Sequence, residues 1–280
     1  MTPKWMQVLV LSMFCAVMGC PSGPSAPLRA AAQPDTSSAQ PVAAAPVIGS
    51  TKINPKDGAV MVYVPAGQFL MGSKQGEGYQ QEHPQHEVYL DGYWIYKNDV
   101  TVAQYRKFCT ATRRNMPDRP VRGWKEDHPV VCVSWDDAKA YCDWVGTTLP
   151  TEAQWEKAAR GTDGRNYPWG NDWDKTKGNS ADSGLKATTP VGSYPGGASP
   201  YGCLDMAGNV WQWCADWYGP YDAAATENPA GPATGGFRVL RGGSWVNPSG
   251  SCRSAYRGDL NPVGRGYGIG FRCVGPAGLP

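Results

Sequence analysis

Residues 241–257 contain the side chains best suited to redox chemistry, but they include only one cysteine, Cys252. A thiolate can act as a nucleophile or as a ligand for a soft metal ion, and Cu(I) is held by thiolates at low coordination number. One thiol cannot form a ligand pair, and no neighbour in the sequence is an evident cause of a lowered thiol pKa. Cys252 is therefore a candidate thiol without a visible activator.

Two of the three histidines form another possible centre. His83 and His86 lie next to Glu82 and Glu87, and two imidazoles with a carboxylate would suit Fe(II). Residues three apart in a loop or strand need not converge on one point, however. We favour a structural role for these histidines and keep an iron centre as the alternative.

Three helices can be predicted from their start signals, because a hydroxyl cap is followed three residues later by a side chain that can reach back to it. These caps are Thr101, Ser134 and Thr151, and the helices should run over 101–113, 134–146 and 151–161. Short β-like runs cover 60–64, 69–71, 87–90, 93–96, 237–241 and 270–274. Two or three helices with short antiparallel strands and many loops predict an α+β domain.

The first residues resemble an export signal. A short apolar run follows Lys4 and leads to a small-residue segment ending at Cys20, which is typical of a bacterial lipoprotein processing site. We predict a signal peptide over 1–19, lipidation of Cys20 and membrane attachment in the cell envelope, at the outer membrane in a Gram-negative source. Ordinary secretion is the alternative.

Composition divides the rest of the chain. Residues 20–55 are rich in Ala, Pro and Ser and should form a disordered tether, with a partner-binding Pro-rich ligand as the alternative. One domain should follow over 56–275, with a tail over 276–280. The chain has 35 Gly, 25 Pro, 12 Trp and 14 Tyr, which predicts dense turns packed by large aromatic side chains. A net charge of +2 gives no basic surface for nucleic acid.

Six segments occur in an order that resembles the formylglycine-generating enzyme (sulfatase-modifying factor) family. They are Met61-Val-Tyr-Val-Pro-Ala-Gly-Gln-Phe-Leu-Met-Gly72, His128-Pro-Val-Val-Cys-Val-Ser-Trp135, Leu149-Pro-Thr-Glu-Ala-Gln-Trp-Glu-Lys-Ala-Ala-Arg-Gly161, Ala207-Gly-Asn-Val-Trp-Gln-Trp213, Arg241-Gly-Gly-Ser-Trp245 and Gly270-Phe-Arg-Cys273. The resemblance covers about residues 58 to 275. It implies a variant C-type-lectin-like fold with little regular secondary structure.

The resemblance also implies an activity, copper-dependent oxidation of a sulfatase cysteine by O₂, that uses two thiols after the Gly-Gly-Ser motif. The first falls on Asn247, and the second matches only loosely, to Ser249 or Cys252. A neutral amide cannot replace a thiolate on Cu(I). We therefore expect this copper-dependent activity to be lost and copper to be absent. Because some relatives are described as iron enzymes, an oxidoreductase in the broader family sense is the alternative.

Calcium is the cofactor that the resemblance supports best, since catalytic relatives hold two ions through carbonyl, carboxylate and amide oxygens. The first ion would match Asn179, Ser180, Asp182 or Ser183, and Leu185. The second would match Asp205, Gly208, Val210 and Gln212. Hydrogen-bonded loops without an ion are the alternative, and either role is structural.

Seven cysteines should remain after processing, and an exported domain with this many thiols should contain disulfides. The resemblance implies a bridge between Cys142 and Cys273, and the positions of a second family bridge hold Ala159 and Ser254. Elimination suggests Cys214 with Cys252 and Cys109 with Cys132, with Cys203 left over. A bridged Cys252 would be unavailable for catalysis; the alternative keeps it reduced beside Cys203.

The resemblance places the substrate cleft at Trp211, Ser244, Trp245 and Asn247, which could remain a binding surface for a peptide or protein. Late arginines could line a groove for an anionic ligand, but we favour a role in bracing loops through carboxylates such as Asp216 and Asp259. They are Arg238, Arg241, Arg253, Arg257, Arg265 and Arg272. Two functions remain: a lipid-anchored binding or accessory module, and a metal-dependent oxidoreductase.

Overall fold

The computed structural model describes residues 45–278. The predicted signal peptide, the lipidation site Cys20 and most of the predicted tether lie outside these residues. No helix within 45–278 is long and apolar enough to cross a membrane.

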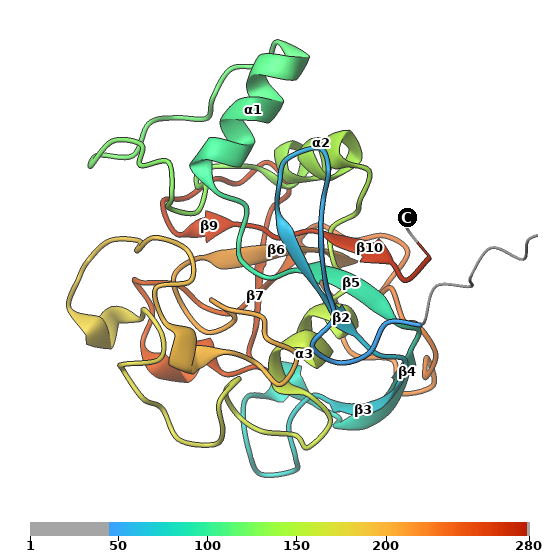
Figure 1. Cartoon of the computed structure of the whole chain (residues 1–280). Helices are drawn as coiled ribbons and strands as arrows, with labels where there is room; N and C mark the ends of the chain where they lie inside the picture. Colours follow the sequence, from blue (N-terminus) through green and yellow to red (C-terminus); the bar gives the residue numbers. More distant parts are fainter. Residues whose placement is uncertain (1–44, 279–280) are drawn as a thin grey trace, which may run out of the picture. The chain divides into compact units, whose positions relative to one another are not determined.

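All three predicted helices are present. They are α1 (Val102–Thr112), α2 (Trp135–Val145) and α3 (Glu152–Arg160). Thr101, Ser134 and Thr151 each accept a hydrogen bond from the backbone three residues on, and the side chain there returns the bond, so each helix begins with a complete capping box. Figure 1 shows α1 projecting from the strands, with α2 and α3 lying closer to them.

The strands form three small sheets (Figure 1). The first has the order β1 (Thr51–Ile53), β2 (Val60–Val64), β5 (Tyr93–Tyr96) and β10 (Val274–Pro276). The second pairs β3 (Gly67–Met71) with β4 (His86–Leu90). The third has the order β8 (Arg257–Leu260), β7 (Arg238–Arg241), β6 (Trp211–Trp217) and β9 (Ile269–Gly270). Pairing is antiparallel except between β6 and β9.

Several boundaries differ from the sequence prediction. β1 lies inside the segment predicted as tether and pairs with β2, so the ordered domain begins before residue 56. The predicted strand over 270–274 is divided between β9 and β10, and Pro276 belongs to β10 rather than to the tail. β6 and β8 were not predicted. In β6 the polar residues Gln212 and Asp216 are buried while Trp211 and Trp217 are partly exposed, so its buried face does not read as hydrophobic.

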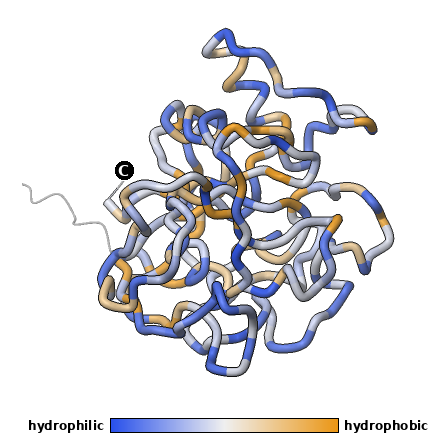
Figure 2. The backbone as a smooth tube through the Cα atoms, turned by 180° about the vertical axis from the view of Figure 1, so that it is seen from behind, coloured by the Kyte–Doolittle hydropathy of each residue, from blue (hydrophilic) through white to orange (hydrophobic). Residues whose placement is uncertain are grey.

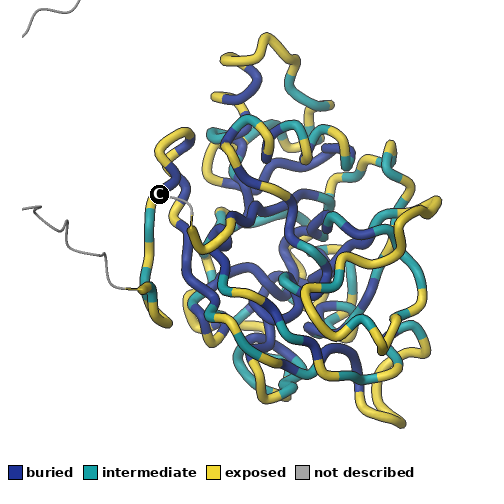
Figure 3. The backbone as a smooth tube through the Cα atoms, turned by 90° about the vertical axis from the view of Figure 1, so that its right-hand side faces the viewer, coloured by how far each residue is buried: buried dark blue, intermediate teal, exposed yellow. Residues whose placement is uncertain are grey.

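Two clusters of buried side chains form most of the core. In one, Tyr105 and Phe108 of α1 pack with Tyr141 of α2 and with Phe271. The other surrounds Trp155 of α3, which is fully buried. Figures 2 and 3 show hydrophilic and exposed segments mainly in the outer loops and buried backbone running through the middle. Aromatic side chains therefore fill the space between short elements, as the composition predicts.

Long connections carry the candidate site. Between α3 and β6 the chain forms only two single-turn 3-10 helices, η2 (Ala181–Ser183) and η3 (Pro195–Gly197). Another, η4 (Ser249–Cys252), follows β7. The predicted loop-rich α+β class is confirmed.

Candidate functional site

The four predicted cleft residues lie together. Trp211 opens β6, and Ser244 follows a turn in which Gly242 and Gly243 have φ of 95° and 68°, values that favour glycine. The Asn247 Oδ1 atom accepts hydrogen bonds from Trp211 Nε1 at 2.9 Å and from Ser244 Oγ at 2.6 Å. Trp245 Nε1 donates to the Tyr267 carbonyl at 3.1 Å. The amide of Asn247 is thus fixed as an acceptor within the cleft.

Cys252 lies behind this turn. Its side chain is fully buried and packs with Tyr167 and Ala207. Burial, with a smaller contribution from Asp182, raises the pKa of the Cys252 thiol to about 12. The thiol is consequently protonated at neutral pH, which removes the nucleophilic and metal-binding form.

A cavity of about 180 Å³ opens beside Trp245. Trp124, Tyr267 and the 93% exposed Val121 give it an apolar wall. The wall also includes His128, whose Nδ1 atom lies 2.9 Å from Thr188 Oγ1. Burial and the neighbouring Lys125 lower the pKa of His128, so the imidazole is neutral near pH 7. Positive charge at the cavity comes from Arg122, Lys125 and Lys186.

The first predicted calcium set surrounds η2. Asn179 is buried, and its Oδ1 atom accepts a hydrogen bond from Ser183 Oγ at 2.9 Å. Ser180 Oγ caps η2 by accepting from the Asp182 amide at 3.1 Å. One carboxylate oxygen of Asp182, Oδ2, accepts from Ser249 N at 3.3 Å, and the side chain is exposed. Asp182 therefore keeps acceptor capacity of the kind that a hard cation uses.

The second predicted set fits calcium poorly. Gln212 Oε1 accepts from Trp155 Nε1 at 2.7 Å and from Arg272 Nε at 2.6 Å, so both lone pairs of this oxygen are used. Gln212 Nε2 donates to the Asp205 carbonyl, and the Gly208 carbonyl accepts from Val210 N. Burial raises the pKa of Asp205. A buried guanidinium beside these oxygens already supplies the positive charge.

The histidine and glutamate group does not form a metal centre. Glu82 is buried and holds Arg253 through two hydrogen bonds of 2.7 and 2.8 Å, while Ser73 donates to it. Burial alone would raise the pKa of Glu82, but these bonds bring it below its usual value. Within residues 45–278, no group of three His, Cys, Asp or Glu side chains could hold a metal ion.

Of the predicted cysteine pairs, only Cys142 and Cys273 lie next to each other in the described structure. Cys142 Sγ and Cys273 Sγ lie 3.3 Å apart as thiols in the structure, so the implied bridge joins neighbouring side chains and stays a prediction. Cys214 and Cys252 belong to different buried clusters, as do Cys109 and Cys132. In the described part of the chain, neither of these two pairs makes a sulfur contact.

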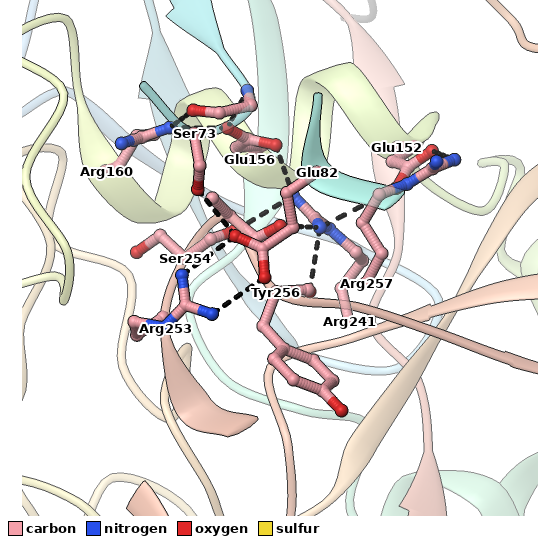
Figure 4. Close-up of polar contacts among 12 residues, drawn as sticks. Ser73, Glu82, Glu152, Glu156, Arg160, Arg241, Arg253, Ser254, Tyr256 and Arg257 are labelled. Atoms are coloured by element: carbon pink, nitrogen blue, oxygen red, sulfur yellow. Dashed lines mark hydrogen bonds and ion pairs between the residues drawn. The ribbon is translucent and has the colours of Figure 1, made fainter. Parts of the chain in front are cut away.

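The late arginines brace the fold, but mainly through glutamates rather than Asp216 or Asp259. Arg241 pairs with Glu156, which also holds Arg160, and Arg257 pairs with Glu152 (Figure 4). Arg272 pairs with Asp99 and Arg265 with Asp137. Arg238 lies between the rings of Trp135 and Trp217, 3.8 and 3.5 Å from their centres.

Sequence reasoning missed the cavity beside Trp245. Its wall joins the segment 120–131, the segment 186–188 and residues 245 and 267, which are far apart in the sequence. The adjacent Trp124 and Lys125, and His128, lie in a segment without the periodicity of a helix or strand, so the sequence did not mark them as part of one surface. Only Trp245 connected this surface to the predicted cleft.

A loop-rich α+β domain in which a Gly242-Gly243 turn leads into Ser244 and Trp245, beside Trp211, is what the class of formylglycine-generating-enzyme-like proteins implies. The chain belongs to the sulfatase-modifying factor enzyme 1-like domain family, whose model matches residues 48–277.

The chain is similar in sequence or structure to several proteins with different assigned names. The chain is 39% identical to the serine/threonine-protein kinase pkn1 of Chlamydia caviae, over 76% of this chain but only 37% of that protein. It is 36% identical to the formylglycine-generating enzyme of Streptomyces coelicolor, over 80% of this chain and 92% of that enzyme. Among solved structures it resembles PvdO from Pseudomonas aeruginosa, with a TM-score of 0.74, 29% identity, and coverage of 82% and 99% of the two chains.

Proposed function

We propose that this domain binds a peptide or protein ligand through the cleft and the cavity beside Trp245, and that it does not oxidise cysteine by the copper route. The loss of the copper route is supported by the state of Asn247, which holds the first matched position, and of Cys252, one of the two residues that match the second loosely. Asn247 offers a hydrogen-bonded amide, and Cys252 is a buried thiol with a pKa of about 12. A pair of accessible thiolates is needed to hold Cu(I).

The cavity indicates what the ligand should present. Trp124, Trp245 and Tyr267 favour an aromatic or bulky apolar side chain, since aromatic rings gain from packing beyond the area that they bury. Arg122, Lys125 and Lys186 favour carboxylates on either side of it. A peptide with a large apolar residue between acidic ones satisfies both features.

A labelled peptide with one tryptophan between pairs of glutamates tests this function by fluorescence anisotropy. We expect saturable binding, which Trp245→Ala weakens by about tenfold or more because it removes the central anchor. Phe237→Ala, at a half-exposed aromatic residue outside the cavity, should leave binding unchanged. Equal binding of a peptide with lysines in place of the glutamates, or no effect of Trp245→Ala, contradicts the proposal.

The oxidoreductase alternative has a direct test. Copper-loaded protein is incubated with O₂ and a sulfatase-derived cysteine peptide, and the peptide mass is followed. We expect no aldehyde. Aldehyde formation above a metal-free control overturns the assignment as a binding module.

For calcium, we propose one structural ion at Asn179, Ser180, Asp182 and Leu185. Support comes from the exposed Asp182 carboxylate in the same loop as the buried Asn179, whose amide oxygen accepts from Ser183 Oγ. Saturating calcium should raise the melting temperature relative to chelator, by mass action on the folded state. Asp182→Asn should abolish the increase and Asp172→Asn, in a neighbouring exposed loop, should retain it. An unchanged melting temperature in the starting protein rules the site out.

For location, we propose a lipid anchor at Cys20 that holds the domain in the cell envelope. The support is the apolar run ending at Cys20. Metabolic labelling with palmitate should mark the protein in membrane fractions, and Cys20→Ala should abolish the label. Cys15→Ala is the control, because this cysteine leaves with the signal peptide. A soluble, unlabelled protein contradicts the anchor.

A further inference from the structure

A second cavity, of about 320 Å³, lies at the N-terminal end of α3 and shares no lining residue with the cavity beside Trp245. Its wall is formed by Met71, His86, the start of α3, Asp216 of β6, Arg257 of β8, and loops within residues 219–232. This volume is within the usual size of small-molecule sites. The proposed peptide-binding function makes no use of it.

Asp216 supplies a buried carboxyl group in this cavity that makes no ion pair within residues 45–278. Its side chain is 4% exposed, and within residues 45–278 no Lys, Arg or His nitrogen lies within 4 Å of its carboxylate. Asp216 Oδ2 accepts one hydrogen bond, from the Glu152 amide at 2.8 Å. Burial, and then repulsion from Glu152, raise the pKa of Asp216 to about 7. A buried carboxylate normally has a cationic partner.

The other ionic groups of the wall are already paired with each other. Glu152 binds Arg257 through both oxygens, at 2.6 and 2.7 Å. Arg257 also donates to the Gln81 and Gly219 carbonyls. The only further carboxylate of the described lining is the exposed Asp222. Above pH 7, where the Asp216 carboxyl group is mostly ionised, the charge left over in this cavity is therefore negative and belongs to Asp216 and Asp222.

Tyr221 provides an independent sign of a missing ligand. Tyr221 is one of the lining residues, and its hydroxyl is buried and has no hydrogen-bond partner in the described chain. The guanidinium of Arg257 lies over its ring at 4.0 Å and therefore does not satisfy the hydroxyl. Leaving a buried hydroxyl unpaired costs on the order of 1–3 kcal/mol. A ligand with an N–H group could pair with this oxygen.

The rest of the wall is mainly apolar. Met71, Ala153, Pro220 and Pro232 present hydrocarbon surface to the cavity. A charged group alone would leave this surface in contact with water. An apolar body attached to the charged group would bury it.

We propose that this cavity binds an organic ammonium ion whose charged head pairs with Asp216 and donates to the Tyr221 hydroxyl, while its apolar body packs on the methionine and proline wall. The site is separate from the peptide cleft. A neutral molecule of the same shape would leave Asp216 without a counter-charge, and an anion would be repelled.

Isothermal titration with phenethylammonium at pH 8, using the full folded chain, tests the site. We expect saturable binding with a Kd of about 1 mM or tighter. The neutral analogue 2-phenylethanol should bind at least about tenfold more weakly. Phenylacetate should not bind.

Three variants separate recognition from folding. Asp216→Asn keeps an oxygen for the Glu152 amide but loses the charge, so it should weaken phenethylammonium binding about tenfold or more without lowering the melting temperature. Tyr221→Phe removes the unpartnered hydroxyl; it should weaken binding and leave stability unchanged or higher. Trp245→Ala should leave binding at this second cavity unaffected.

Several results overturn the proposal. They are the absence of phenethylammonium binding to the folded protein, equal binding of 2-phenylethanol, and full binding by Asp216→Asn. If Trp245→Ala removes both peptide and ammonium binding, the ammonium ion occupies the peptide cleft instead, and the second cavity carries no such site.

Discussion

Asn247 accepts hydrogen bonds at the position where the family resemblance places a copper-binding thiol. Trp211 and Ser244 direct their polar hydrogens at its amide oxygen, so the surrounding residues have a role that does not depend on a metal. A Cβ added to Gly243 of the turn would lie only 2.8 Å from the Cys252 sulfur, so no larger residue fits there without a shift. The Cys252 sulfur therefore packs directly against the backbone of this turn.

Cys252 should resist alkylation. Because its thiol is buried and its pKa is about 12, we expect native protein at pH 8 to leave Cys252 unlabelled by iodoacetamide, and unfolded protein to be labelled fully. Peptide mapping by mass spectrometry gives the extent at each cysteine. Rapid labelling of Cys252 in the native state would restore it as a catalytic candidate.

A buried carboxylate of helix α3, Glu156, connects the helix to two neighbouring strands. Glu156 accepts from the Gly72 amide at the end of β3, pairs with Arg160 one turn on, and reaches Arg241 at the end of β7 (Figure 4). Arg241 in turn donates to carbonyls at residues 254–256. Two buried side chains, Glu156 and Arg241, therefore connect the end of β3 to residues 254–256, just after Cys252.

Removing the charge of Glu156 should be costly. Glu156→Gln leaves Arg160 and Arg241 buried with a weaker partner, so we expect a loss of about 3–5 kcal/mol in the free energy of unfolding. Glu126→Gln, in the exposed pair with Arg106, should cost less than about 1 kcal/mol. Urea denaturation of both variants measures the difference, and similar losses would contradict a specific role for the buried network.

The start of each element was easier to predict than its tertiary partners. Thr101, Ser134 and Thr151 fix their helices through contacts within four residues, so the sequence alone carried that information. The partners of Arg241 and Arg257 lie about a hundred residues away, and nothing in the sequence distinguishes Glu152 from Asp216 as the paired carboxylate. The second cavity was equally hidden, because its wall is assembled from residues 71 to 257.

Across the whole described domain, distant parts of the chain meet near its C-terminal end. β5 pairs with β2 on one side and with β10 on the other, and Cys142 of α2 touches Cys273 just before β10. The family membership and loop-rich fold could be predicted from the ordered motifs. The contacts that close the domain could not, since they join segments with no shared periodicity.

A Cys142–Cys273 bridge should form in an oxidising compartment. Closing this long loop is worth roughly 4 to 5 kcal/mol in the chain-entropy model, and less is often realised. We expect non-reducing peptide mapping of exported protein to recover the linked peptides, and Cys142→Ala to lower the melting temperature. Cys132→Ala is the control for loss of a buried thiol. Recovery of Cys142 as a free thiol in exported protein would refute the bridge.

Arg272 lies C-terminal to all of the residues whose oxygens accept its hydrogen bonds. Its guanidinium is fully buried and gathers the carbonyls of Tyr96, Lys97 and Leu204 with the Asp99 carboxylate and Gln212. During synthesis on the ribosome, these oxygens have no counter-charge until residue 272 has emerged. We therefore expect the domain to close only after residue 272 has been translated. A nascent chain interrupted upstream of Arg272 should therefore stay more protease-sensitive than the full-length chain.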